Sequence, residues 1–168
     1  MPPGFHVIAT VENPHLSTEL SILSDDGRME VRYALRDDSE MLAMLDQCKH
    51  QPNCVGADAF KAEVAFGVTG AMNLFQVSPE QLPLNPLPAV PVRLEFNANW
   101  GIVTAARVDA AFSHAQPPTT FMYLHRDPGA NIYVVMLMHD QAAMSDVQPV
   151  VFHALRFREP VGLGGKWL

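Results

Sequence analysis

The sequence predicts an α+β fold, in which an antiparallel β-sheet is covered on one face by two consecutive helices of the first half. Apolar residues alternate with polar ones, as they do in strands, over residues 20–35 and again in the second half from residue 92. Between these regions, residues 39–75 repeat their apolar residues at helical spacing. Residues 79–91 hold five of the 14 prolines. Because proline donates no amide hydrogen bond, we expect this segment to form neither a helix nor a central strand but a crossover.

We expect a single domain over residues 1–168, since neither half is long enough to close a core of its own. Residues 1–78 then form a β-hairpin and two helices, and residues 92–168 form antiparallel strands and a short tail. The two halves differ in charge, because residues 1–80 carry 5 basic and 12 acidic residues whereas residues 81–168 carry 6 of each. All of the net charge of −7 therefore lies in the first half.

A hairpin is the first predicted element. Leu20 and Ile22 alternate with polar neighbours, the sequence SDDG provides turn residues, and the alternation resumes at Met29 and continues to Leu35. The segment Phe5 to Val11 predicts a third strand.

Two helices are predicted next. Asp37 or Ser39 caps the first, which carries apolar residues at helical spacing and ends near His50 because a proline follows. The second begins at Asp58 and presents one apolar stripe that extends to Phe75.

The second half predicts strands throughout. Residues 92–96 alternate, NANWG provides a turn, and the return strand extends to Phe112; a last strand is predicted over Val150 to Arg158. The clearest hairpin covers residues 119–140, with Pro128 and Gly129 at the positions that a type II turn prefers.

We predict that Arg126 faces Asn131 in this hairpin, and both of its faces are then apolar. One face would carry Phe121, Tyr123, Val134, Met136 and Met138, and the other Met122, Leu124, Tyr133, Val135 and Leu137. Strands that are apolar on both faces are usually covered on both. The helices can cover one face, so the other needs a second layer or another subunit. This predicts a homo-oligomer or a protein partner.

Charge and hydropathy exclude some classes of function. Three lysines and a net charge of −7 argue against binding to nucleic acid, which requires a basic stripe. No apolar run is long enough to span a membrane and no export signal is visible, so we expect a soluble, cytoplasmic protein.

Cys48, His50 and Cys54 form the tightest group of chemically active residues. Thiolate and imidazole are zinc ligands, but a closed zinc site takes four ligands, and His15 or Asp58 would have to complete it. Two separate structural thiols are the favoured interpretation; a disulfide and a zinc site are the alternatives. No other cofactor is predicted.

His139, its neighbour Asp140 and His153 are the candidates for acid–base catalysis, because imidazole titrates near neutrality and a carboxylate can orient it. Isolated histidines more often have structural roles. No nucleophile elbow, phosphate loop or dinucleotide motif occurs.

Two hypotheses of function follow. The first is a non-catalytic binding or assembly subunit, which self-associates or docks a protein partner through an apolar sheet face and whose acidic half could steer a basic partner. The alternative is a small-molecule enzyme or ligand-binding domain with a histidine-based polar site between helices and sheet.

Overall fold

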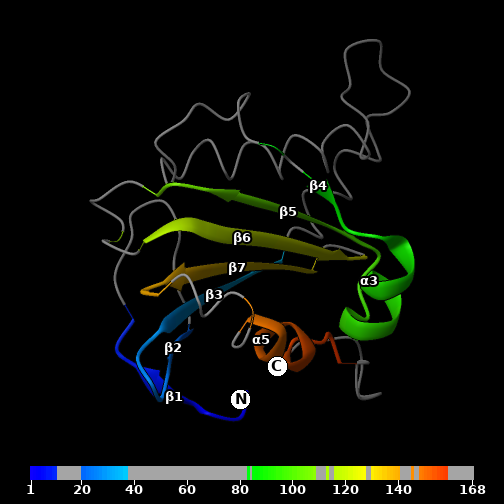
Figure 1. Ribbon diagram of the computed structural model, residues 1–168. Helices are drawn as coiled ribbons and strands as arrows, with labels where there is room; N and C mark the ends of the chain where they lie inside the picture. The colour runs from blue at the N-terminus through cyan, green and yellow to red at the C-terminus, as the bar shows by residue number, and fades with distance from the viewer. Residues whose placement is uncertain are drawn as a thin grey trace, which may run out of the picture.

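The computed structural model describes residues 1–10, 20–37, 83, 85–108, 113, 116–127, 130–140, 145 and 148–158. This part of the chain forms one seven-stranded antiparallel sheet and two short helices (Figure 1). The strands are β1 (Phe5–Ile8), β2 (Leu20–Ser24), β3 (Met29–Asp37), β4 (Asn85–Pro86), β5 (Trp100–Ala106), β6 (Gln116–Arg126) and β7 (Ala130–Met138). The helices are α3 (Ala89–Phe96) and α5 (Gln148–Ala154).

The sheet joins two meanders in the order β1-β2-β3-β7-β6-β5-β4. The junction is the long antiparallel pair of β3 with β7, from Met29 opposite Met138 to Asp37 opposite Ala130. Strands from both sides of the proline-rich segment therefore share one sheet, with β1 and β4 at its edges.

The predicted α+β class, with two consecutive helices of the first half over one face, is wrong. The fold is mainly antiparallel sheet, and both described helices follow the proline-rich segment or lie at its end. The predicted cap Asp37 is the last residue of β3. Pairing of β3 with β2 stops at Tyr33, but pairing with β7 continues to Asp37 and keeps this residue in the strand. The segments 39–50 and 58–75, where these helices were predicted, lie outside the described residues.

Both helices replace segments that were predicted as strands. Val92 and Phe96 are buried while Leu94 between them is 68% exposed, so the spacing of four residues, and not the alternation, determines α3. In α5, Val151 is buried against the sheet.

The proline-rich segment also contributes regular structure. Pro86 lies in β4, an edge strand, where a missing amide donor is tolerated. Pro88 precedes α3 and Pro91 lies in its first turn, where helical amides have no partner within the helix. The expectation that these prolines exclude a helix is therefore wrong.

The first predicted hairpin forms as β2 and β3, with Leu20 opposite Tyr33 and Ile22 opposite Val31. Side chains close its turn: the Ser24 hydroxyl donates to Asp26 (2.7 Å), and the Arg28 Nε donates to the same carboxylate (2.6 Å). These two hydrogen bonds lower the pKa of Asp26 from 3.8 to about 2. Phe5–Ile8 adds the predicted third strand, antiparallel to β2.

The hairpin of β6 and β7 forms with a register one residue away from the predicted one. Arg126 lies opposite Ala130, not Asn131, so three residues connect the paired positions instead of four. This shift exchanges the partners of every side chain across the hairpin. Phe121 and Tyr123 therefore share a face with Tyr133, and Met122 and Leu124 share the opposite face with the β7 residues Val134, Met136 and Met138.

The main hydrophobic core lies on the second of these faces, which we call the helix-side face. The buried side chains of α3 and α5 pack there against β3, β6 and β7 (Figure 1). The opposite face, which we call the aromatic face, is also buried: Phe121, Tyr123 and Tyr133 are at most 1% exposed. Both faces of the hairpin are thus buried, and the homo-oligomer or protein partner stays a prediction.

Candidate functional site

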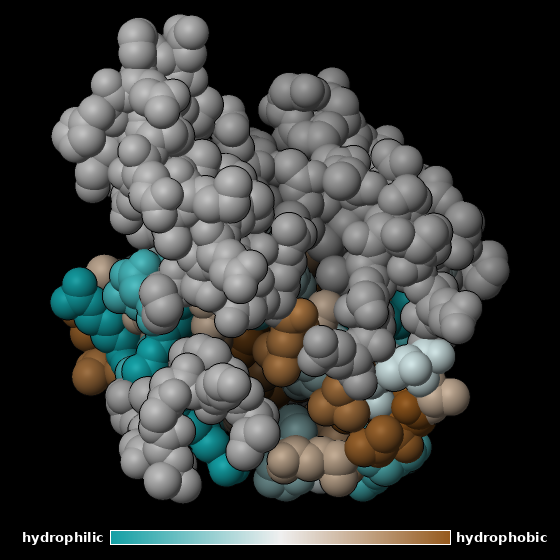
Figure 2. Space-filling model, turned by 180° about the vertical axis from the view of Figure 1, so that it is seen from behind, coloured by the Kyte–Doolittle hydropathy of each residue, from teal (hydrophilic) through white to brown (hydrophobic). Residues whose placement is uncertain are grey.

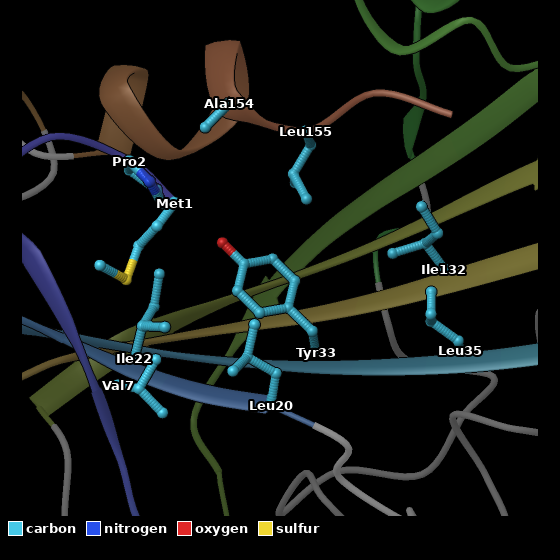
Figure 3. A pocket seen from close by; sticks show the side chains of 10 residues that line it. All are labelled: Met1, Pro2, Val7, Leu20, Ile22, Tyr33, Leu35, Ile132, Ala154 and Leu155. Atoms are coloured by element: carbon cyan, nitrogen blue, oxygen red, sulfur yellow. The ribbon is translucent and has the colours of Figure 1, made fainter. Parts of the chain in front are cut away.

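An apolar groove of about 330 Å³ opens on the helix-side face, at the end of the sheet that holds β1 and β2. The sheet forms its floor, and the end of α5 and the first two residues of the chain form the opposite wall (Figure 3). Its lining, by which we define the apolar groove, consists of Met1, Pro2, Val7, Leu20, Ile22, Tyr33, Leu35, Ile132, Ala154 and Leu155.

Strand pairing brings the floor residues together from four strands. Val7 of β1 lies opposite Ile22 of β2, Leu20 lies opposite Tyr33 of β3, and Leu35 lies opposite Ile132 of β7. Residues directly opposite each other point to the same face of a sheet. Because β2 begins at Leu20, the β3 residue Leu35 has no β2 residue beside it and remains 57% exposed.

Tyr33 is the one polar side chain in this lining. It is 9% exposed, and its hydroxyl points from the sheet toward the end of α5 and the start of the chain (Figure 3). Within the described part of the chain this hydroxyl has no hydrogen-bond partner. Burial raises the pKa of Tyr33 from 10.0 to about 12, so the phenol stays protonated and able to donate at neutral pH.

The mouth of the groove is exposed and apolar. Met1, Val7, Leu20 and Leu35 are four of the six large hydrophobic side chains that are exposed in the described part of the chain. The opposite side of the molecule, seen from behind, also has apolar side chains at its surface, at the lower right of the view (Figure 2). Exposed apolar side chains that gather beside a cavity are typical of a binding site, whereas single exposed hydrophobic residues occur on most protein surfaces.

The predicted catalytic histidines lie elsewhere and apart from each other. His139 follows β7, where its Nε2 is 3.8 Å from the Glu30 carboxylate, and its neighbour Asp140 is exposed. His153 lies on the outer surface of α5, 3.6 Å from Glu95 of α3. Neither histidine lines the apolar groove.

Cys48, His50 and Cys54 lie outside the described residues, and the zinc hypothesis remains a prediction. Among the residues that the structure describes, no three His, Cys, Asp or Glu side chains gather in a way that could hold a metal ion.

The aromatic face carries a hydrogen-bonded cluster that the sequence analysis missed. The Asn131 Oδ1 accepts a hydrogen bond from the Tyr123 hydroxyl (2.7 Å) and lies 2.7 Å from the His125 Nδ1. The Trp100 ring packs beside both Tyr123 and His125, at centroid distances of 5.1 and 5.5 Å. Tyr123, His125 and Asn131 thus share hydrogen bonds, which favours a structural role, whereas the buried Trp100 Nε1 has no hydrogen-bond partner among the described residues.

A second, polar cleft of about 410 Å³ lies where β6 ends beside α3. Arg93, Arg126 and Asp127 contribute its charges, and Asn97 and Asn99 contribute amides. The cleft is framed by its own hydrogen bonds: Asn97 donates to the Phe157 carbonyl, and Asn99 accepts from the Asp127 amide. The lining therefore holds two cationic side chains against one carboxylate.

The sequence analysis also missed Tyr33 as a site residue. The available signal was a single phenol in the otherwise aliphatic alternation of β3, but the groove around it depends on β1, β7 and α5.

No helix in the described ranges is long and apolar enough to cross a membrane. Comparison of the chain with protein-family models, with curated proteins and with solved structures finds no match.

Proposed function

We propose that this chain is a non-catalytic binding domain that holds a small, largely apolar molecule in the apolar groove. The single observation that carries the proposal is the lining: nine apolar residues and one phenol around about 330 Å³. Small-molecule sites are typically concave, mostly apolar and equipped with few polar groups, and this volume lies at the lower end of their range.

The composition of the lining favours binding over catalysis. Acid–base chemistry requires a group that changes protonation near the working pH, and nucleophilic catalysis requires an activated nucleophile. Among the side chains of the groove only Tyr33 is titratable, and its pKa of about 12 keeps it protonated. Its side chains can enclose and orient a molecule but cannot transfer a proton near neutral pH.

Titration with Nile red, a neutral dye whose fluorescence rises in apolar surroundings, tests this proposal. We expect saturable binding of one dye per chain, and competition by a short-chain apolar molecule such as decane. Fluorescence that rises without saturation, or a dye that no apolar competitor displaces, would contradict a defined site.

Self-association through the same apolar surface is the second candidate. It is favoured by the position of the exposed mouth, where Val7 projects from β1, an edge strand whose outer side pairs with no other described strand. Edge strands offer unpaired amides and carbonyls to a second chain. Sedimentation velocity at micromolar concentration tests this candidate: a dimer that dissociates on Val7→Glu supports it, and a monomer excludes it.

A further inference from the structure

We propose that the ligand of the apolar groove is a neutral amphiphile whose carbonyl oxygen accepts a hydrogen bond from the Tyr33 hydroxyl. The inference rests on the proposed function and specifies the chemical class of the ligand. It follows from three properties of the groove: a donor without a partner among the described residues, a lining without charged side chains, and an open apolar mouth.

The donor comes first. Tyr33 is nine-tenths buried, its hydroxyl has no partner within the described residues, and its oxygen, unlike the buried atoms that lack a partner, is accessible from the groove. Its oxygen shares a lone pair with the ring, so a phenol donates better than it accepts. A ligand that offers an acceptor in this position satisfies the hydroxyl, and a pure hydrocarbon leaves it unsatisfied.

The absence of charged side chains from the lining determines the kind of acceptor. None of the ten lining residues has a cationic side chain, and the cation that the lining does hold, the Met1 α-ammonium, belongs to a residue that is 79% exposed at the mouth. Burying a carboxylate or phosphate against the Tyr33 hydroxyl is costly, because the charged group loses its water and gains one neutral hydrogen bond there, while a cation on an exposed residue is screened by solvent. An ester, ketone or aldehyde carbonyl loses much less on transfer and makes the same bond with Tyr33.

The shape of the groove positions the rest of the molecule. Val7 and Leu35 are more than half exposed at the mouth, whereas Ile22 is fully buried. An alkyl chain anchored at Tyr33 can therefore cover side chains that are otherwise in contact with water. The gain is proportional to the apolar area removed from water.

Displacement of Nile red at neutral pH by three matched probes compares the head groups. Methyl decanoate has a neutral carbonyl, decanoate has a charged carboxylate, and decane has no acceptor. We expect methyl decanoate to bind more tightly than the other two. We expect Tyr33→Phe to weaken methyl decanoate by about five- to tenfold, the effect of one lost hydrogen bond, and to leave decane unchanged. Circular dichroism of the variant verifies that it is folded.

The wild-type chain provides an independent measurement that needs no variant. Decanoate should bind more tightly as the pH falls from 7 toward about 4, because protonation makes its head group neutral. Decanoate that binds as tightly as the ester at neutral pH overturns the inference, and so does Tyr33→Phe with unchanged ester affinity. If decane alone binds, this inference fails and the proposed function stands; if no probe binds, both fail.

Discussion

His125 lies directly opposite Asn131 across the β6–β7 pair, with the His125 Nδ1 2.7 Å from the Asn131 Oδ1. The same oxygen accepts from the Tyr123 hydroxyl, and the side chains of all three residues are almost fully buried. One amide oxygen thus joins side chains from both strands on the aromatic face. The free energy of unfolding should therefore depend more on the Asn131 side chain than on an exposed asparagine.

Asn131→Ala removes this shared oxygen from the cluster. We expect the free energy of unfolding to fall by about 2–4 kcal/mol, because two buried polar groups lose the same partner. Chemical denaturation measures the change. Asn85→Ala is the matched control, since the exposed Asn85 donates only to the Pro83 carbonyl in the described part of the chain. If both variants lose equal stability, the cluster has no special role.

Gly101→Ala should destabilise the sheet through a steric clash. A Cβ atom at this position would lie 2.7 Å from the Leu124 Cδ2 and 2.9 Å from the Tyr123 carbonyl oxygen. Backbone cannot move away as a flexible side chain can, so we expect a loss of about 1–3 kcal/mol in thermal or chemical denaturation.

Gly27→Asn is the control for this variant. Gly27 has a φ of +70°, but a Cβ atom added there would meet nothing within 4 Å, and asparagine tolerates left-handed backbone. This substitution should change stability much less than Gly101→Ala. Equal losses in the two variants would exclude the clash as the cause.

Asp26 makes the β2–β3 turn sensitive to acid. Its pKa is lowered to about 2 in the folded chain, from an ordinary value of 3.8, so the folded state favours the carboxylate. The stabilisation is therefore fully present above pH 3.8 and is lost as the pH falls toward 2. Asp26→Asn should lower the denaturant midpoint of unfolding at about pH 6 and have little effect near pH 2. An effect of the same size at both pH values would contradict this account.

The parts of the fold that the sequence predicts are those with local signals. The β2–β3 hairpin has strict alternation on both sides of SDDG, and only one register suits both. The β6–β7 hairpin is different, because both faces are apolar in either register and alternation cannot choose between them. The structure favours the register that places Tyr123 beside Tyr133 and lets the Tyr123 hydroxyl donate to the buried Asn131.

The helices were mispredicted because short apolar segments suit two periods. Val92, Leu94 and Phe96 alternate as a strand would, while Val92 and Phe96 alone have helical spacing. Only packing shows which is correct, since Leu94 is exposed. The groove could not be predicted from the sequence, because its lining comes from four strands, from the end of α5 and from the start of the chain. Only long-range strand pairing and helix packing bring these segments together.

The most direct test of the account measures Nile red binding by two matched pairs of variants. Val7→Glu and Leu35→Glu place a charge at the mouth of the groove; Val90→Glu and Leu94→Glu place the same charge at similarly exposed apolar positions on α3. We predict that the first pair weakens binding by about fivefold or more, which corresponds to roughly 1 kcal/mol, and that the α3 pair leaves it unchanged. Equal effects of the two pairs would contradict a binding site in the groove.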